Sequence, residues 1–136
     1  MTDLDNVMKH GSSLYLYEIE RKTWQDAADF CENIGYHLVS IGSMEEHEFV
    51  LELIENYIGT FVMETSYWIG LNDVGKQGNY VSSDGRNQVF WHWDFGSPSL
   101  LYIDERCISV IRYKEAWTNI KCSEMLSFVC EKSESE

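Results

Sequence analysis

Four cysteines, Cys31, Cys107, Cys122 and Cys130, constrain the fold of this chain more than any other feature of its sequence. An even number of widely spaced cysteines predicts two disulfide bonds, and therefore a secreted or extracellular protein from an oxidising compartment. The chain has no C-x-x-C pair, which is the spacing of zinc ribbons and thioredoxin-type redox sites. Four cysteines allow three pairings, and spacing alone does not choose among them.

The first half of the chain predicts a strand over 12–20, two amphipathic helices, and a short strand over 38–41 between the helices. Thr23 is expected to cap the first helix and Ser43 the second, each with an acidic residue at capping-box spacing. Gly35 and Gly59 are expected to end them. Apolar residues at helical spacing predict the buried face of the first helix (Trp24, Ala27, Ala28, Cys31, Ile34) and of the second (Phe49, Val50, Leu53, Ile54, Tyr57).

Short strand patterns separated by turn residues make up the second half, and strands are expected over 67–71, 89–93, 107–111, 116–117 and 128–130. Two helices followed by many short strands indicate an α+β fold. We expect a single domain over 1–131 and an acidic tail over 132–136. No run of about 18 apolar residues is present, so membrane insertion is not expected, and the acidic start lacks a signal-peptide pattern.

Charge and motifs argue against several classes of function. The net charge of −13, from 23 acidic and 10 basic residues, disfavours nucleic acid and anionic membranes as partners. His47-Glu48 resembles the start of a zinc-protease helix, but Leu51 replaces the second histidine, so we interpret this segment as a surface helix. No nucleophile or nucleotide-binding motif occurs, and we expect no enzymatic activity. His92 is expected to face solvent from an edge strand.

A shaped loop is predicted between Trp91 and Cys107. It contains the only proline of the chain, Pro98, in a Gly-Ser-Pro-Ser turn that is followed directly by Leu100, Leu101 and Tyr102. These apolar side chains either pack into a small core of the loop or form a contact surface for a ligand.

The chain resembles the C-type lectin-like domain over nearly its whole length, from about Leu14 to Glu131. The residues that carry the resemblance are Trp24, Ala27, Ala28 and Cys31; Gly35 with 38–41; 68–71; Trp93, Gly96 and Pro98; and Cys107, Trp117, Cys122 and 128–131. The resemblance implies two helices flanking short antiparallel sheets, a long loop region, and the disulfides Cys31–Cys130 and Cys107–Cys122. Leu14 stands where an extra cysteine of the longer form would fall, which implies the short form.

Many members of this family bind sugar through Ca²⁺, which takes six to eight oxygen ligands. The resemblance implies that these come from a Glu-Pro-Asn or Gln-Pro-Asp triplet, a glutamate two residues before Cys107, and a Trp-Asn-Asp triplet. The first triplet here is Ser97-Pro98-Ser99 and the last is Trp117-Thr118-Asn119, so only Glu105 remains as a carboxylate. We therefore expect no calcium at the sugar position, no other metal and no cofactor.

The second calcium position of the family is also altered. Asp73 is retained, but Gln77 and Arg106 occupy places where carboxylates would be expected. The Ser97–Pro98 peptide bond is expected to be cis, as it is in relatives whose loop is shaped by calcium.

These observations favour a non-catalytic extracellular recognition module that binds a glycan or protein ligand without calcium. Its expected contact residues are Ser97, Ser99, Leu100, Leu101, Tyr102, Glu105, Thr118 and Asn119, with Leu100 to Tyr102 as an apolar anchor or Tyr102 and Trp91 as a stacking platform for sugar. One alternative is a structural protein associated with a mineral or other surface, which the acidic charge fits. Another is a subunit of a homo- or hetero-oligomer that uses the long loop as its interface.

Overall fold

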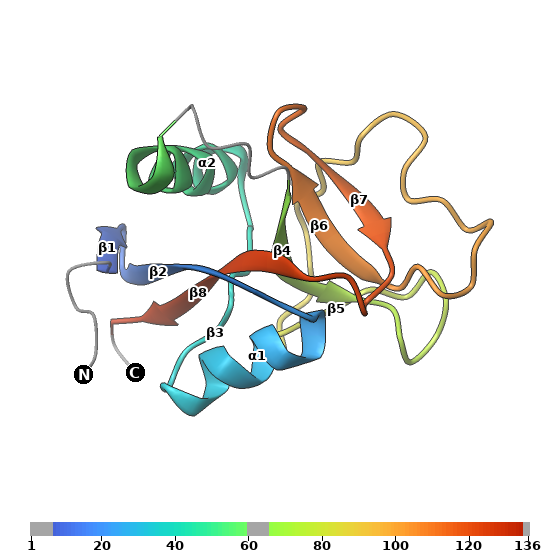
Figure 1. Cartoon of the computed structure of the whole chain (residues 1–136), viewed down its shortest axis with the longest axis horizontal. Helices are drawn as coiled ribbons and strands as arrows, with labels where there is room; N and C mark the ends of the chain where they lie inside the picture. The colour runs from blue at the N-terminus through green and yellow to red at the C-terminus, as the bar shows by residue number, and fades with distance from the viewer. Residues whose placement is uncertain (1–6, 60–65, 135–136) are drawn as a thin grey trace.

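The computed structural model of the chain describes residues 7–59 and 66–134. Two helices lie on opposite sides of one sheet, α1 (Trp24–Asn33) on one face and α2 (Met44–Ile58) on the other (Figure 1). The strands are β1 (Val7–His10), β2 (Ser13–Lys22), β3 (His37–Leu38), β4 (Ser66–Asn72), β5 (Val81–Ser82), β6 (Cys107–Ile111), β7 (Ala116–Ile120) and β8 (Leu126–Ser133).

The described strands form a single mixed sheet in the order β1-β2-β8-β4-β6-β7, with β3 added to β8 and β5 added to β4. The predicted α+β class is confirmed, with one difference. The pairing of β4 with β8 is parallel, whereas the family resemblance implied short antiparallel sheets. The relative direction of β4 and β8 depends on the path of the chain that leads from α2 into β4 and from β7 into β8. Local sequence patterns do not predict that path.

The helix caps agree with the sequence analysis in most details. The Thr23 side chain accepts a hydrogen bond from the Asp26 N–H, and Ser43 does the same for Glu46. The Glu46 carboxylate, however, accepts from the Gly42 N–H instead of from the cap residue itself. Gly35 follows α1 with a positive φ of 83°, a conformation that glycine adopts without strain.

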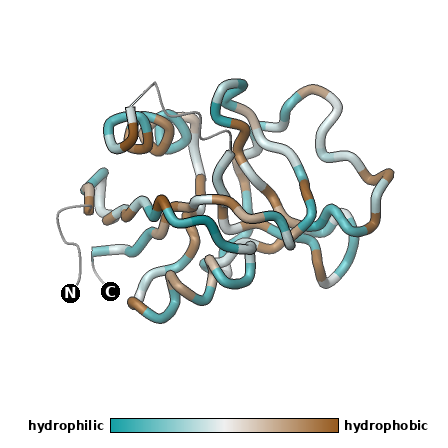
Figure 2. The backbone as a smooth tube through the Cα atoms, in the orientation of Figure 1, coloured by the Kyte–Doolittle hydropathy of each residue, from teal (hydrophilic) through white to brown (hydrophobic). Residues whose placement is uncertain are grey.

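Two apolar cores hold the helices to the sheet. Trp24, Ala27 and Cys31 of α1 pack against Trp68 and Phe128 on one face. On the other face α2 contributes Val50, Leu53 and Ile54, which pack with strand residues that include Ile69, Ile108 and Trp117. Figure 2 shows the hydrophobic colour on the side of α2 that faces the sheet.

Both predicted disulfides are present, Cys31–Cys130 between α1 and β8 and Cys107–Cys122 beside the β6–β7 pair. No helix in the described ranges is both long and apolar enough to cross a membrane.

Several elements differ from those predicted from the sequence; the strand expected over 38–41, for example, is β3 over 37–38. Residues 89–93 form no strand, and only Trp93 makes an isolated bridge, to Trp117. The strands β1 and β5 were not predicted. The segment expected as a tail begins inside β8, where Lys132 and Ser133 pair with β2, and residues 135–136 lie outside the described ranges.

Candidate functional site

The long loop leaves the sheet after Trp93 and returns at Cys107, beside β6 and β7 (Figure 1). Its start is fixed by backbone hydrogen bonds, from the Trp117 N–H to the His92 carbonyl (2.8 Å) and from the Asp94 N–H to the Trp117 carbonyl (2.8 Å). The Ser97–Pro98 peptide bond is cis, as predicted. The loop therefore leaves the sheet from a rigid base.

The polar residues expected at the site bond to one another. The Asn119 carboxamide is almost fully buried; its oxygen accepts from the Ser99 N–H (2.9 Å), and its NH₂ donates to the carbonyls of Ser99 (2.6 Å) and Glu105 (3.0 Å). The hydroxyls of Ser97 and Thr118 share a hydrogen bond of 2.9 Å. The structure thus brings Ser97, Ser99, Glu105, Thr118 and Asn119 together as predicted. Their neutral groups hold the loop to β7.

The apolar residues of the loop project into solvent instead of forming a core. The exposed fraction is 57% for Leu100, 83% for Leu101, 60% for Tyr102 and 72% for Ile103. Figure 2 shows hydrophobic colour at the outer end of this loop. We call residues 100–103 the apolar ridge. Of the two interpretations left open by the sequence, the exposure excludes a small core within the loop, and the contact surface stays a prediction.

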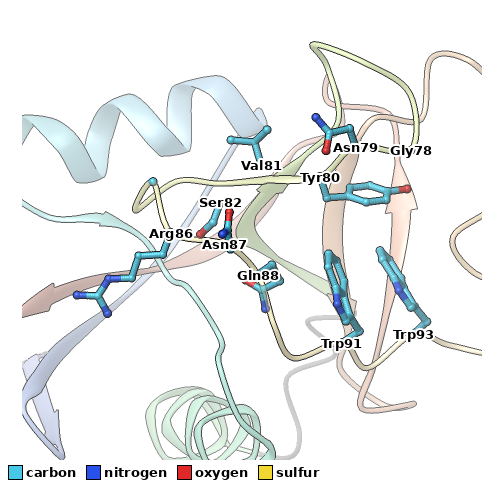
Figure 3. Close-up of a pocket in the computed structure, with 11 residues that line it drawn as sticks. Gly78, Asn79, Tyr80, Val81, Ser82, Arg86, Asn87, Gln88, Trp91 and Trp93 are labelled. Atoms are coloured by element: carbon cyan, nitrogen blue, oxygen red, sulfur yellow. The ribbon is translucent and has the colours of Figure 1, made fainter.

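Trp91 is not part of this ridge. It lies with Tyr80 and Trp93 along a separate groove of about 750 Å³, between residues 78–88 and the segment that precedes the long loop (Figure 3). The Trp91 and Trp93 rings are nearly parallel, with centroids 5.7 Å apart, and Tyr80 meets Trp91 edge-on at 6.0 Å. Tyr102 does not line this groove, so the expected pairing of Tyr102 with Trp91 as one platform is wrong.

His47 and His92 pack against each other beside the sheet. His47 is buried between α2 and the sheet, where Trp117 Nε1 donates to its Nδ1 (3.3 Å) and its Nε2 donates to the Glu115 carbonyl (2.9 Å). Burial lowers the pKa of His47 and favours this neutral form. His92 is half-buried, with its ring 4.6 Å from that of His47. The prediction that His92 faces solvent from an edge strand is therefore wrong, and the helix that was interpreted as a surface helix buries its histidine.

Comparison with known proteins gives the family. Residues 20–132 match the family described as "Lectin C-type domain". This chain belongs to the C-type lectin domain family. The chain is 34% identical over 122 residues to C-type lectin lectoxin-Lio1 of Erythrolamprus poecilogyrus, covering 85% of this chain and 72% of the relative. It is 32% identical over 120 residues to human C-type mannose receptor 2, covering 88% of this chain and 8% of that protein. The crystal structure of human lithostathine superposes with a TM-score of 0.87 at 29% identity and covers 97% of this chain and 91% of that one.

The sugar-site residues of this C-type lectin domain do not suit a calcium ion. Hard Ca²⁺ prefers several carboxylate oxygens, yet the side chains of both altered triplets supply three hydroxyls and a carboxamide that already make hydrogen bonds within the site. Glu105 joins the network through its backbone carbonyl. An ion would have to break these bonds without gaining a carboxylate set.

At the second calcium position of the lectin family, a cation already lies beside Asp73. Arg106 Nη1 donates to the Asp73 backbone carbonyl (3.0 Å), and Arg106 Nε donates to the Ile103 carbonyl (2.6 Å). The Asp73 carboxylate is buried; one oxygen accepts from the Gly78 N–H (2.7 Å), and the other has no partner in the described part of the chain. A fixed guanidinium beside this single carboxylate disfavours a divalent ion.

The groove residues Tyr80, Asn79 and Asn87 were not predicted from the sequence. One signal was available, because residues two apart in an extended segment point to the same side. That rule places Trp91 and Trp93 together and His92 opposite them, as observed. Nothing local indicated that residues 78–88 would form the facing wall.

Proposed function

We propose that this domain is a non-catalytic, extracellular recognition module that binds its ligand through the long loop without calcium. The observation that carries the proposal is the exposed apolar ridge. It lies next to the position of the family's sugar site, where the polar groups bond to one another and few carboxylates are available for calcium. Large apolar side chains concentrated on an exposed surface are typical of protein contact sites. The proposed contact residues are Leu100, Leu101 and Tyr102 of the ridge, together with the polar residues at its base, Ser97, Ser99, Glu105, Thr118 and Asn119.

The ridge favours a protein ligand over a glycan at this position. Leu100, Leu101 and Ile103 offer no groups for sugar hydroxyls, and the polar groups of Asn119 are already bonded. The two disulfides fit an oxidising, extracellular environment.

Calcium titration tests the metal-free part of the proposal. The wild-type chain is expected to show no saturable calorimetric binding of Ca²⁺ below about 1 mM, because the loop lacks a carboxylate set. A variant with the family triplets, Ser97→Glu, Ser99→Asn, Thr118→Asn and Asn119→Asp, is the matched positive control and is expected to gain binding. Saturable binding by the wild type in this range would refute the claim.

A charge placed on the ridge tests its role in binding. Leu101→Asp is expected to weaken capture of the ligand at least tenfold in a screen of extracellular proteins run in EDTA, because desolvating a carboxylate at an apolar contact is costly. Val89→Asp makes the same change at another exposed position, 79% exposed, and should leave binding intact. Equal losses in both variants would contradict a specific role of the ridge.

The oligomer hypothesis predicts a different result for the same pair of variants. Wild-type protein would then elute from gel filtration as a dimer or larger species, and Leu101→Asp alone would convert it to a monomer. In that case the ligand of the ridge is a second copy of the chain.

A further inference from the structure

We propose that the aromatic groove of Tyr80, Trp91 and Trp93 is a second binding site, which takes a neutral, β-linked oligosaccharide of glucose-type rings. It is a separate surface from the apolar ridge, and it does not depend on the function proposed for the ridge. Its volume of about 750 Å³ lies within the usual range of small-ligand sites, roughly 300–1,000 Å³.

The walls of the groove are fixed by bonds that need no ligand. The Ser83 N–H donates to the Gly70 carbonyl (2.8 Å), which ties the 78–88 segment to β4. The Asp84 carboxylate accepts from the Ser82 hydroxyl (2.8 Å) and from the Arg86 N–H (2.9 Å), which closes the turn. Binding in a preformed groove loses less conformational entropy than binding to a mobile loop.

The opposite wall is anchored by side chains. Gln88 Nε2 donates to the carbonyls of Ile41 (2.6 Å) and Phe90 (2.7 Å), which holds the segment leading to Trp91. Trp93 packs against buried Trp117, with ring centroids 6.1 Å apart. Trp91 therefore rests on a rigid aromatic base while its own side remains 39% exposed.

The exposed ring of Trp91 suits the face of a pyranose. A ring whose hydroxyls are all equatorial presents flat faces of C–H groups, and these bury well against an aromatic surface. Tyr80 stands at an angle to the Trp91 ring and bounds the platform (Figure 3). β-linked rings of glucose type keep such faces along a chain, which is the geometry that an open groove accommodates.

Carboxamides beside the aromatics match the hydroxyls at the edge of such a ring. Asn79 and Asn87 line the groove, and neither side chain has a hydrogen-bond partner among the residues that the structure describes. A carboxamide both donates and accepts, as a sugar hydroxyl does. Arg86 is the charged residue among those lining the groove, and its side chain extends away from the tryptophans (Figure 3). The site is therefore neutral where the ligand would lie.

A proline-rich peptide is the other ligand class that uses aromatic grooves. Such a peptide offers many carbonyl acceptors but few donors, so it would leave the carboxamide oxygens of Asn79 and Asn87 unmatched. The chemistry of the groove therefore favours the sugar.

Nuclear magnetic resonance of the full ¹⁵N-labelled chain in EDTA tests the assignment, with cellotetraose, laminaritetraose and chitotetraose as probes. At least one sugar is expected to shift the Trp91 indole and the Asn79 and Asn87 carboxamide signals saturably, with half-saturation at or below about 1 mM. Trp91→Ala should weaken that binding about tenfold, and Trp91→Phe should retain most of it. Leu101→Asp, on the ridge, should leave it unchanged.

Asn87→Ala is a second variant that preserves the fold, since the exposed Asn87 side chain makes no hydrogen bond within the described part of the chain. It is expected to weaken the sugar about threefold or more. The proposal is overturned if none of the three sugars shifts these signals saturably, or if Trp91→Ala binds as well as the wild type. Decaproline shifting the same signals when the sugars do not would overturn it in favour of a peptide site.

Discussion

Replacing Cys31 and Cys130 together by alanine is expected to lower the free energy of unfolding by about 4–5 kcal/mol, the largest effect predicted for this chain. The disulfide joins residues 99 apart in sequence, and closing so long a loop removes more entropy from the unfolded chain than closing a short one. Both cysteines are fully buried in the core between α1 and the sheet, so the substitutions also leave unfilled space.

The second disulfide provides the matched comparison. Cys107 and Cys122 are 15 residues apart, and the alanine pair at these positions is expected to cost about 3 kcal/mol. Urea unfolding followed by tryptophan fluorescence at 25 °C measures both variants against the wild type. A smaller loss from the Cys31 and Cys130 pair than from the Cys107 and Cys122 pair would contradict the loop-length argument.

Replacing Glu131 by glutamine is expected to stabilise the protein at pH 8 by about 3 kcal/mol and to have little effect near pH 4. Glu131 is a buried carboxyl on β8 whose Oε1 accepts from the Ser40 N–H (3.0 Å). Burial, and then repulsion from the neighbouring Glu46 carboxylate, raise the pKa of Glu131 to about 7. Glu46 is itself held in place by hydrogen bonds from the Tyr15 hydroxyl and the Gly42 N–H.

The direction of this pH dependence follows from proton uptake. Between the unfolded pKa of about 4.5 and the folded pKa of about 7, the folded chain binds more protons at Glu131 than the unfolded chain. The contribution of Glu131 to the free energy of unfolding is therefore fully present below about pH 4.5, and it is lost as the pH rises to about 7. Glutamine keeps an acceptor for the Ser40 N–H and has no charge to bury.

Urea denaturation from pH 4.5 to 8 measures the difference in the free energy of unfolding between Glu131→Gln and the wild type. Urea is used because it does not screen charges as a guanidinium salt does. The lowered pKa of His47 acts in the opposite direction on acidification, so the difference between Glu131→Gln and the wild type, not the wild-type curve alone, isolates Glu131. Glu52→Gln, at an exposed position of α2, is the matched control and should leave the curve unchanged. Parallel curves for Glu131→Gln and the wild type would show that Glu131 is charged in the folded protein at pH 5.

Local sequence signals predicted the helices and most strands well. Thr23 and Ser43 cap the helices they were expected to cap, because a hydroxyl three residues from a free N–H needs no distant partner. Apolar periodicity predicted most of the buried faces of α1 and α2 in the same way. The prediction was wrong for Ile34 and Tyr57, which are 39% and 42% exposed near the ends of the two helices. The cysteine pairing came from family resemblance, since spacing left three choices open.

The candidate site was predicted less completely, and the errors share one cause. His47 lies on α2 at a position whose exposure depends on the chain after β6, which places Glu115 and Trp117 against it. The direction in which Leu100 and Leu101 point depends on the bonds that Asn119 makes to the loop base. Helical or strand periodicity describes neighbours along the chain and carries no information on these contacts.

The sequence by itself determined the α+β class, because helix caps and apolar periodicity are properties of neighbouring residues alone. Its resemblance to the C-type lectin-like domain added the disulfide pairing and a sugar site in which only Glu105 remains as a carboxylate. Only the tertiary structure decided that the apolar ridge is exposed, that Trp91 and Tyr80 share a groove, and that Glu131 is buried beside Glu46. Exposure, groove formation and pKa all depend on which distant segments exclude water from a side chain. Those segments come together only in the folded chain, where the sheet lies between α1 and α2.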